Sequence, residues 1–286
     1  MFKRKLADLL AARLMAAASI AVVSIVVLIA AGLVLKSLPI LEAHPLNDLL
    51  LSPLWKPTKG EFGLYPFIMG TLWVTLLAGA LAMPLSILSA LYLAEYAPAR
   101  VRAAVKPVLD LLSGIPPVVF GVWGVLALSA GGISIGFNVL AGGIVLAIMV
   151  VPVVTAISEE VFRTVSREVK EASLSLGATR WETAKLVVLR SSLAGVGAAV
   201  ILGFSRAFGE TMAVLMVVGN VPRAPGSLFD PAYPLAALLA NNYGEMLSVP
   251  LYDSAMLLAA LVLFAVIIFF NIVARLVLVR VHRRAA

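Results

Sequence analysis

Six long apolar runs alternate with polar segments along the chain, and this pattern predicts membrane-spanning helices. Each run holds roughly 20 residues or more, the length that a helix needs to cross a hydrocarbon core of about 30 Å. The runs are continuously apolar rather than alternating, which favours helices over the strands of a membrane barrel. We therefore predict an all-α polytopic membrane protein with a single transmembrane domain over residues 1–286. Its six predicted helices lie at about 14–35, 66–93, 108–128, 132–157, 191–219 and 253–279.

One polar segment, residues 158–190, separates the fourth apolar run from the fifth. It is strongly charged, contains mostly helix-favouring residues and is interrupted once, by Gly177. A glycine permits the sharp change of direction that joins two helical pieces. The segment predicts a cytoplasmic site where a soluble protein binds and drives the membrane subunit. A solvated charged loop is the alternative.

Composition and charge place the chain in a membrane and give its orientation. The chain is 62% hydrophobic and only 13% charged, with a mean hydropathy of +1.06, which lies outside the soluble range. If the N-terminus is inside, the outer segments hold four of the 22 Lys and Arg residues, and Arg206 lies within a helix. Because Lys and Arg collect in cytoplasmic loops, we predict a multi-pass protein of the cytoplasmic (inner) membrane with both termini cytoplasmic. The net charge of +7 needs no nucleic-acid partner.

The residue types exclude several kinds of chemistry. There is no cysteine, and the two histidines, His44 and His282, fall on opposite sides of the predicted membrane. The chain therefore has no disulfide, no thiolate nucleophile and no predicted metal site. It also lacks the G-x-x-x-x-G-K-[ST] phosphate loop. We predict a chain that is not an enzyme and has no catalytic residue or cofactor of its own.

Two outer segments, about 36–65 and 220–252, are long and rich in proline and aromatic residues. The apolar spacing from Leu235 to Met246 predicts a short helix near the outer surface. Aromatic residues at this depth indicate either an interfacial anchor, since Trp and Tyr prefer the membrane surface, or a docking surface for another protein.

Helix breakers and small residues mark two of the predicted spans. Within the third, Ser113-Gly114-Ile115-Pro116-Pro117 removes two amide donors and predicts a kink. Irregular backbone at membrane depth is tolerated only against protein or a water-filled cavity, so we place Ser113, Gly114 and Pro116 on a candidate solute pathway. In the fifth span, small residues at four-residue spacing predict a close helix contact; they are Gly195, Ala199 and Gly203.

The fifth span also carries two charged residues, Arg206 and Glu210. Their spacing of four residues predicts that they share one face of the helix. Each would cost about 2.5–3.5 kcal/mol if placed alone at the centre of a spanning helix, which indicates pairing, a polar cavity, or both. We interpret them as pathway residues, with Arg206 attracting an oxyanion and Glu210 orienting Arg206. A purely structural ion pair is the alternative.

The polar segment contains a motif that resembles one found in ABC importer permeases. Glu171-Ala172-Ser173 is followed after three residues by Gly177, and after nine more by Val187-x-Leu189-Arg190. This resembles the EAA motif, written EAA-x3-G-x9-I-x-L-P. Ser173, Val187 and Arg190 depart from it, and the loss of proline weakens only the helix boundary there.

Further stretches narrow the resemblance to permeases of the phosphate-specific (Pst) importer. They are 177–183, 206–214, 60–72 and 112–119, and the last two are more similar to the PstC type than to the PstA type. The resemblance covers nearly the whole chain from about residue 50.

This resemblance implies a type I importer fold (MetI-like), with two six-helix permeases around a central pathway. It implies that an ATPase dimer, which carries the ATP and Mg, grips the coupling residues from the cytoplasm, and that a phosphate-binding protein docks outside. The coupling residues are Glu171, Ala172, Ser173, Gly177, Ala178 and Thr179. The second permease is expected to be a PstA-like chain, although the sequence leaves a homodimer open.

Alternatives from other classes remain. The solute could be another oxyanion, such as molybdate, sulfate or phosphonate. A secondary transporter coupled to ions through Glu210 should show broken helices in both halves, whereas the sequence has one broken region. A membrane enzyme would need metal-ligating or nucleophilic clusters, which the sequence lacks.

Overall fold

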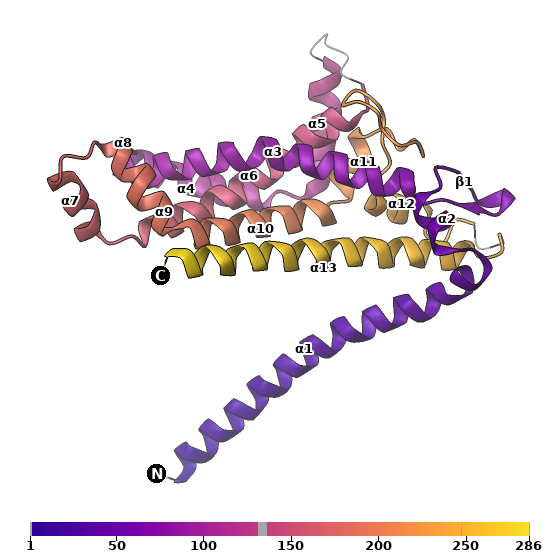
Figure 1. Ribbon diagram of the computed structural model, residues 1–286, viewed down its shortest axis with the longest axis horizontal. Helices are drawn as coiled ribbons and strands as arrows, with labels where there is room; N and C mark the ends of the chain where they lie inside the picture. The colour runs from indigo at the N-terminus through magenta and orange to yellow at the C-terminus, as the bar shows by residue number, and fades with distance from the viewer. Residues whose placement is uncertain (1, 131–135, 247, 286) are drawn as a thin grey trace.

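The computed structural model describes residues 2–130, 136–246 and 248–285, and helices dominate it (Figure 1). Residues 132–135, at the start of the predicted span 132–157, lie outside the described residues. The first half contains α1 (Phe2–Ala43), α2 (Leu46–Leu51), β1 (Trp55–Lys56), η1 (Pro57–Lys59), β2 (Glu61–Phe62), α3 (Tyr65–Glu95), α4 (Ala99–Gly114), α5 (Pro117–Ala130) and α6 (Val139–Arg163). The second contains α7 (Arg167–Ser175), α8 (Arg180–Glu182), the π-helical η2 (Thr183–Val188), α9 (Leu189–Ser191), α10 (Leu193–Gly209), α11 (Met212–Val217), α12 (Leu235–Asn242) and α13 (Tyr252–Ala285).

Four helices of the described chain are long and apolar enough to cross a membrane, namely α1, α3, α6 and α13. Two bent pairs would raise the number to six if each pair forms one span. One pair is α4 with α5, bent by 96°, and the other joins residues 180–191 to α10 with a bend of 72°. These two bends fall at the parts of the chain to which the sequence assigned the solute pathway and the partner contact.

The structure has the predicted kink within the span 108–128, but the helical stretch starts earlier than predicted. The chain is already helical from Ala99, and α4 ends at Gly114 before the prolines, which have no N–H to continue the helix. The first part of α4 carries charges that pack against α6. Arg102 donates to the carbonyls of Leu93 and Ala94 at 2.8 and 3.2 Å and lies 3.7 Å from the buried carboxylate of Glu159. A search for apolar runs misses this stretch because it carries Arg100, Arg102 and Lys106.

The centre of the bundle is formed by α3, α6 and α10. The small residues of α10 lie on α6, as predicted. A Cβ atom built on Gly203 would come within 2.5 Å of Val154 Cγ2, one built on Gly195 would collide with Val161, and Ala199 is fully buried. Close approach of α10 to α6 therefore requires these side chains to be small.

The two long outer segments fold together into one packed cap. Trp55 packs edge-on against Phe67 with ring centroids 5.0 Å apart, and Phe67 packs against Tyr233 at 5.3 Å. The backbone N–H of Leu235, at the start of α12, donates to the hydroxyl of Thr71 at 2.9 Å. Tyr233 and Tyr252 are both buried. These aromatic side chains pack the two segments against each other.

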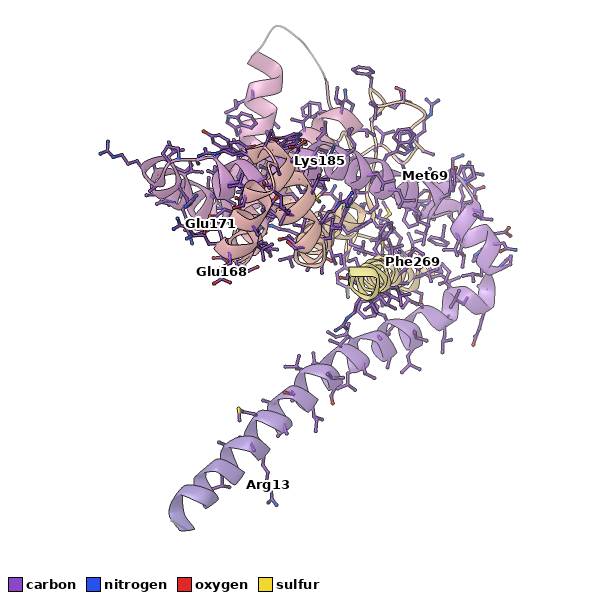
Figure 2. All side chains as sticks on the ribbon, turned by 60° about the vertical axis from the view of Figure 1, so that its left-hand side comes forward. Arg13, Met69, Glu168, Glu171, Lys185 and Phe269 are labelled. Atoms are coloured by element: carbon purple, nitrogen blue, oxygen red, sulfur yellow. The ribbon has the colours of Figure 1, made fainter. Side chains whose placement is uncertain are left out.

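The first helix leaves the bundle. Only the C-terminal part of α1 packs on α13, where Ser254 donates to the carbonyl of Lys36 at 2.9 Å. The rest extends away at an angle with Arg13 near its far end (Figures 1 and 2). None of its most apolar window is buried, so in a membrane this helix contacts lipid or another subunit.

We expect Gly203→Ala to destabilise the bundle, because the added methyl group meets Val154, Val150 and Met83 on two neighbouring helices. Overpacking of this kind costs about 1–3 kcal/mol. Gly209→Ala is the matched control, since a Cβ there meets nothing within 4 Å. The apparent melting temperature of the purified transporter should fall for the first variant only. Equal melting temperatures for both variants would contradict the observed packing of α10 on α6.

Candidate functional site

The broken third span forms the first part of the candidate site. After α4 ends at Gly114, Ile115 is extended and α5 begins at Pro117. Gly114 and Pro116 are exposed, and a Cβ on Gly114 would meet nothing within 4 Å. Non-helical backbone at membrane depth cannot face lipid, because its polar groups would have no partner there. The break between α4 and α5 must therefore face water or another protein.

The structure brings Arg206 to this break. Its guanidinium donates to the carbonyl of Ser113 at 3.5 Å, across 93 positions of sequence. Carbonyls in the last turn of a helix lack intrahelical partners and carry the negative end of the helix dipole. The end of α4 therefore holds the positive charge of Arg206 through a long, weak contact. Two predicted pathway elements thus lie together, one on α4 and one on α10.

The predicted Arg206–Glu210 pair is wrong. The helix α10 ends at Gly209, and Glu210 has extended backbone angles, φ −73° and ψ 122°. Glu210 is therefore the C-cap residue of α10, and no ion pair joins it to Arg206 within the part of the chain that the structure describes. One carboxylate oxygen of Glu210 instead accepts from the N–H of Ala213 at 3.5 Å, at the start of α11. Its place on the solute pathway stays a prediction.

The predicted coupling segment begins with α7, which ends in a glycine-dependent turn. Gly177 has φ +87°, a left-handed conformation that side chains with a Cβ rarely adopt. The N–H of Gly177 bonds to the carbonyl of Leu174 at 3.0 Å, and that of Ala178 to Ser173 at 3.3 Å. This pair of bonds is the Schellman motif, which satisfies carbonyls at a helix end. Gly177 therefore fixes the change of direction that the sequence predicted.

A capping box starts the next helical piece. The hydroxyl of Thr179 accepts from the N–H of Glu182 at 3.2 Å, and the carboxylate of Glu182 accepts from the N–H of Thr179 at 2.8 Å. The backbone N–H and the hydroxyl of Thr179, which both donate to the Glu182 carboxylate, hold the pKa of that carboxyl below its ordinary value of 4.5. The T-x-x-E pattern predicts this cap and is a signal that our reading of the sequence overlooked. Two defined caps make the segment a fixed turn between two helices.

The coupling segment is tied to the bundle by two contacts. Lys170 on α7 pairs with Glu95 at the end of α3 at 2.6 Å, and both side chains are largely buried, at 20% and 15% exposure. Ser173 and Thr183 join α7 to the π-helical turn through a hydroxyl contact of 3.0 Å. Glu95 lies 75 positions before Lys170, and neither the motif nor the apolar pattern pointed to it. This ion pair therefore links α7 directly to the end of α3.

The side of the coupling segment that faces away from the bundle is exposed. Glu168 and Glu171 lie at the edge of the molecule and point away from the bundle (Figure 2). Glu171, Ala172 and Gly177 are exposed. Large apolar side chains are also exposed there, which is unusual for a segment in water; they are Val169, Leu174, Leu176 and Trp181. The mixture of acidic and apolar side chains indicates a protein-binding surface.

Comparison with known proteins shows which family of proteins the chain is related to. Residues 82–283 match the family described as "Binding-protein-dependent transport system inner membrane component". The phosphate transport system permease protein PstC of Xylella fastidiosa (strain Temecula1) is 36% identical over 254 residues, which cover 80% of this chain and 78% of the relative. PstC 2 of Mycobacterium bovis is 34% identical over 287 residues, covering 91% and 88%.

Solved structures agree on the fold. An inward-facing structure of the MetNI methionine ABC transporter superposes with a TM-score of 0.63 at 18% identity, covering 80% of this chain and 99% of that one. The expected all-α, MetI-like permease fold is confirmed by this similarity. The family match, the relatives and the arrangement of helices agree. The chain therefore belongs to the family of binding-protein-dependent transport system inner membrane components.

Proposed function

We propose that the chain is the PstC-type permease subunit of an ATP-driven importer, and that it passes inorganic phosphate through the membrane. The observation that carries the proposal is Arg206, an intramembrane cation whose only polar contact among the described residues is a long one to the open end of α4. An unpaired charge at membrane depth is expensive and marks a functional site. A guanidinium suits the planar, bidentate recognition of an oxyanion. The names of the PstC relatives support phosphate as that oxyanion.

Family membership implies two kinds of partner, a cytoplasmic ATPase and a binding protein, and makes the chain a transport subunit rather than an enzyme. We infer that a second, PstA-like permease completes the pathway. The exposed break at Gly114 and Pro116 supports this inference, because a single copy leaves it uncovered. On this proposal the ATP and Mg are held by the partner ATPase, and both termini lie in the cytoplasm.

The coupling role is assigned to the segment around α7. Its outward side would sit against the ATPase, with Glu171, Ala172 and Gly177 at the contact. Ser173, Ala178 and Thr179 would act from within by fixing the turn, since their hydrogen bonds shape it. Rigid-body movement of the ATPase would then reach α3 through the pair of Lys170 with Glu95.

Another oxyanion is the main alternative, because a guanidinium recognises phosphate, sulfate and molybdate through the same geometry. Competition separates these solutes: excess unlabelled phosphate should block the uptake of labelled phosphate, and sulfate or molybdate should not. A secondary transporter is not favoured, since the family match implies a partner ATPase.

We expect Arg206→Gln to lower phosphate uptake by about 10- to 100-fold, because a charge-assisted hydrogen bond is worth about 1.5–3 kcal/mol. Arg206→Lys should retain part of the uptake, since it keeps the charge and loses the planar fork. Uptake of radiolabelled phosphate is measured in proteoliposomes that contain the whole transporter.

The matched control for this experiment is Arg100→Gln, which removes an exposed arginine at the cytoplasmic start of α4. It should leave uptake unchanged. If Arg206→Gln transports phosphate as well as the Arg100→Gln control does, the pathway role of Arg206 is wrong.

We expect the pair of Lys170 with Glu95 to couple ATP hydrolysis to uptake. Lys170→Met or Glu95→Gln should lower the number of phosphate ions imported per ATP hydrolysed while the ATPase stays bound. The charge swap Glu95→Lys with Lys170→Glu should restore much of the coupling, with a double-mutant interaction of about 1–3 kcal/mol.

Lys106 and Glu160 provide the control pair, because they lie 3.6 Å apart and are both exposed. Exposed pairs contribute little, so Lys106→Met should change nothing. The transmission role fails if the Lys170→Met variant keeps the normal ratio of import to hydrolysis.

A further inference from the structure

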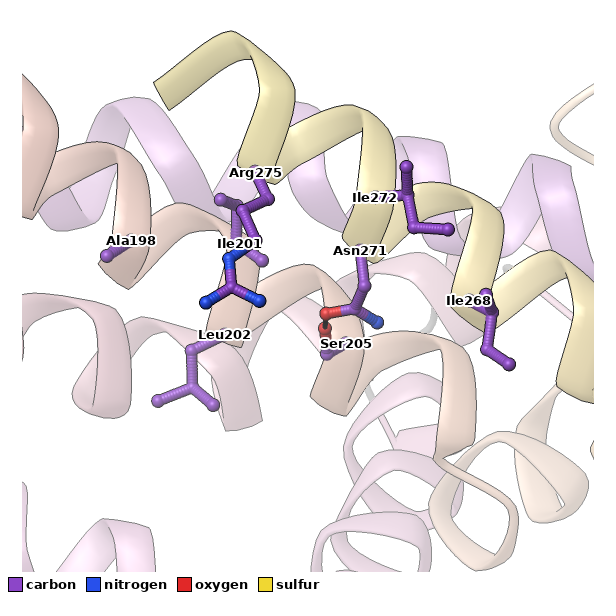
Figure 3. A pocket seen from close by; sticks show the side chains of 8 residues that line it. All are labelled: Ala198, Ile201, Leu202, Ser205, Ile268, Asn271, Ile272 and Arg275. Carbon is purple, nitrogen blue, oxygen red and sulfur yellow. Dashed lines mark hydrogen bonds between the residues drawn. The ribbon is translucent and has the colours of Figure 1, made fainter. Parts of the chain in front are cut away.

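A groove lies between α10 and α13, apart from the candidate pathway and from the coupling segment. Its volume is about 550 Å³, within the range of small-molecule sites. The walls are mostly aliphatic, and the polar side chains lie between Ala198 and Leu202 on one side and Ile268 on the other (Figure 3). The lining residues are Ala198, Ile201, Leu202, Ser205, Ile268, Asn271, Ile272 and Arg275.

Arg275 supplies the charge of this groove. Its side chain reaches from α13 toward α10, so that the guanidinium lies close to Ile201 and Leu202 (Figure 3). The side chain is exposed, and within the described parts of the chain it has no ion pair or hydrogen bond. A cation without a charged partner beside an aliphatic wall suits a ligand that is anionic at one end and apolar at the other.

Next to Arg275, the groove is lined by two polar side chains that are hydrogen-bonded to each other, called the Ser205–Asn271 step below. Ser205 donates to the side-chain oxygen of Asn271 at 2.8 Å (Figure 3). The amide nitrogen of Asn271 donates to the carbonyl of Ile267 at 2.8 Å, which uses one of its two hydrogens. The second hydrogen is available to a carbonyl oxygen of a ligand. Beyond this step, toward Ile268, the wall is aliphatic again.

The positions of these side chains along α13 correspond to the levels at which a phospholipid has its phosphate, its ester groups and its acyl chains. At 1.5 Å per residue, Arg275 lies about 35 Å along α13 from Tyr252 in the outer cap, and Asn271 about 28 Å. With a hydrocarbon core of about 30 Å, Asn271 falls at its inner boundary and Arg275 in the cytoplasmic headgroup region. Phosphate, ester and acyl chain would meet Arg275, the Ser205–Asn271 step and the aliphatic wall in that order.

We propose that the groove between α10 and α13 binds one anionic phospholipid of the cytoplasmic leaflet, with its headgroup on Arg275. This inference rests on the proposed orientation of the chain but not on phosphate as the transported solute. Basic pockets between spanning helices on the cytoplasmic side are suited to anionic headgroups. Because α10 also carries Arg206, a lipid seated here would steady the helix that lines the candidate pathway.

Lipid retention by the purified whole transporter tests the proposal. Native mass spectrometry counts phosphatidylglycerol and phosphatidylcholine of equal chain length that stay bound. The wild type should retain phosphatidylglycerol in preference, and Arg275→Gln should weaken this retention about five-fold, the effect of removing one basic residue near a membrane surface. Arg275→Lys should keep most of it. The control Arg100→Gln, a cytoplasmic arginine outside the groove, should have no effect.

A second variant keeps the charge and fills the groove. Leu202→Trp should reduce the retention of both lipids while Arg275 is still present. The proposal is overturned if Arg275→Gln retains phosphatidylglycerol like the wild type, or if millimolar inorganic phosphate displaces the lipid. It is also overturned if a cysteine at Ile272 cross-links efficiently to another subunit, since the groove would then hold protein. None of these readings requires transport, so they stand or fall separately from the proposed function.

Discussion

Inside a bilayer no water is available to the backbone, so each N–H and C=O group must find a partner within the protein. Most of the described chain meets this constraint by forming helices. Among the described residues, two stretches at membrane depth are not helical. They are the turn at Ile115 and Pro116 and the turn at Glu210 and Thr211. Arg206 lies on the helix that ends at the second break and donates to a carbonyl beside the first. The candidate pathway follows from this constraint, because broken backbone at that depth needs water or protein beside it.

The same need for hydrogen-bond partners shapes the predicted coupling segment. Here the hydrogen bonds at the helix ends make the segment rigid. A Schellman turn at Gly177 closes α7, and a capping box from Thr179 to Glu182 opens the next piece. The pair of Lys170 with Glu95 then attaches this segment to α3. A flexible loop would absorb the movement of a partner, whereas a capped and anchored helix passes it to the membrane domain.

The sequence predicted long apolar helices, the small-residue contact of α10 and the turn at Gly177, because each depends on local pattern. It failed where tertiary contacts decide. Arg102 packs against the end of α3 and against Glu159 on α6, so α4 starts earlier than its apolar run. Glu210 leaves the helix after Gly209, which no spacing rule reveals. The contact of Glu95 with Lys170 and the groove between α10 and α13 each involve residues that are far apart in the chain. Only the folded structure brings these residues together.

Solvent access to the break in the third span tests the central claim most directly. The chain has no native cysteine, and Gly114 has open space for a side chain. In the assembled transporter, Gly114→Cys should react with a membrane-impermeant maleimide in at least one nucleotide state. Leu28→Cys, on the apolar and exposed part of α1, should not react. A Gly114→Cys protein that resists the reagent in every nucleotide state would contradict a water-filled pathway at this break.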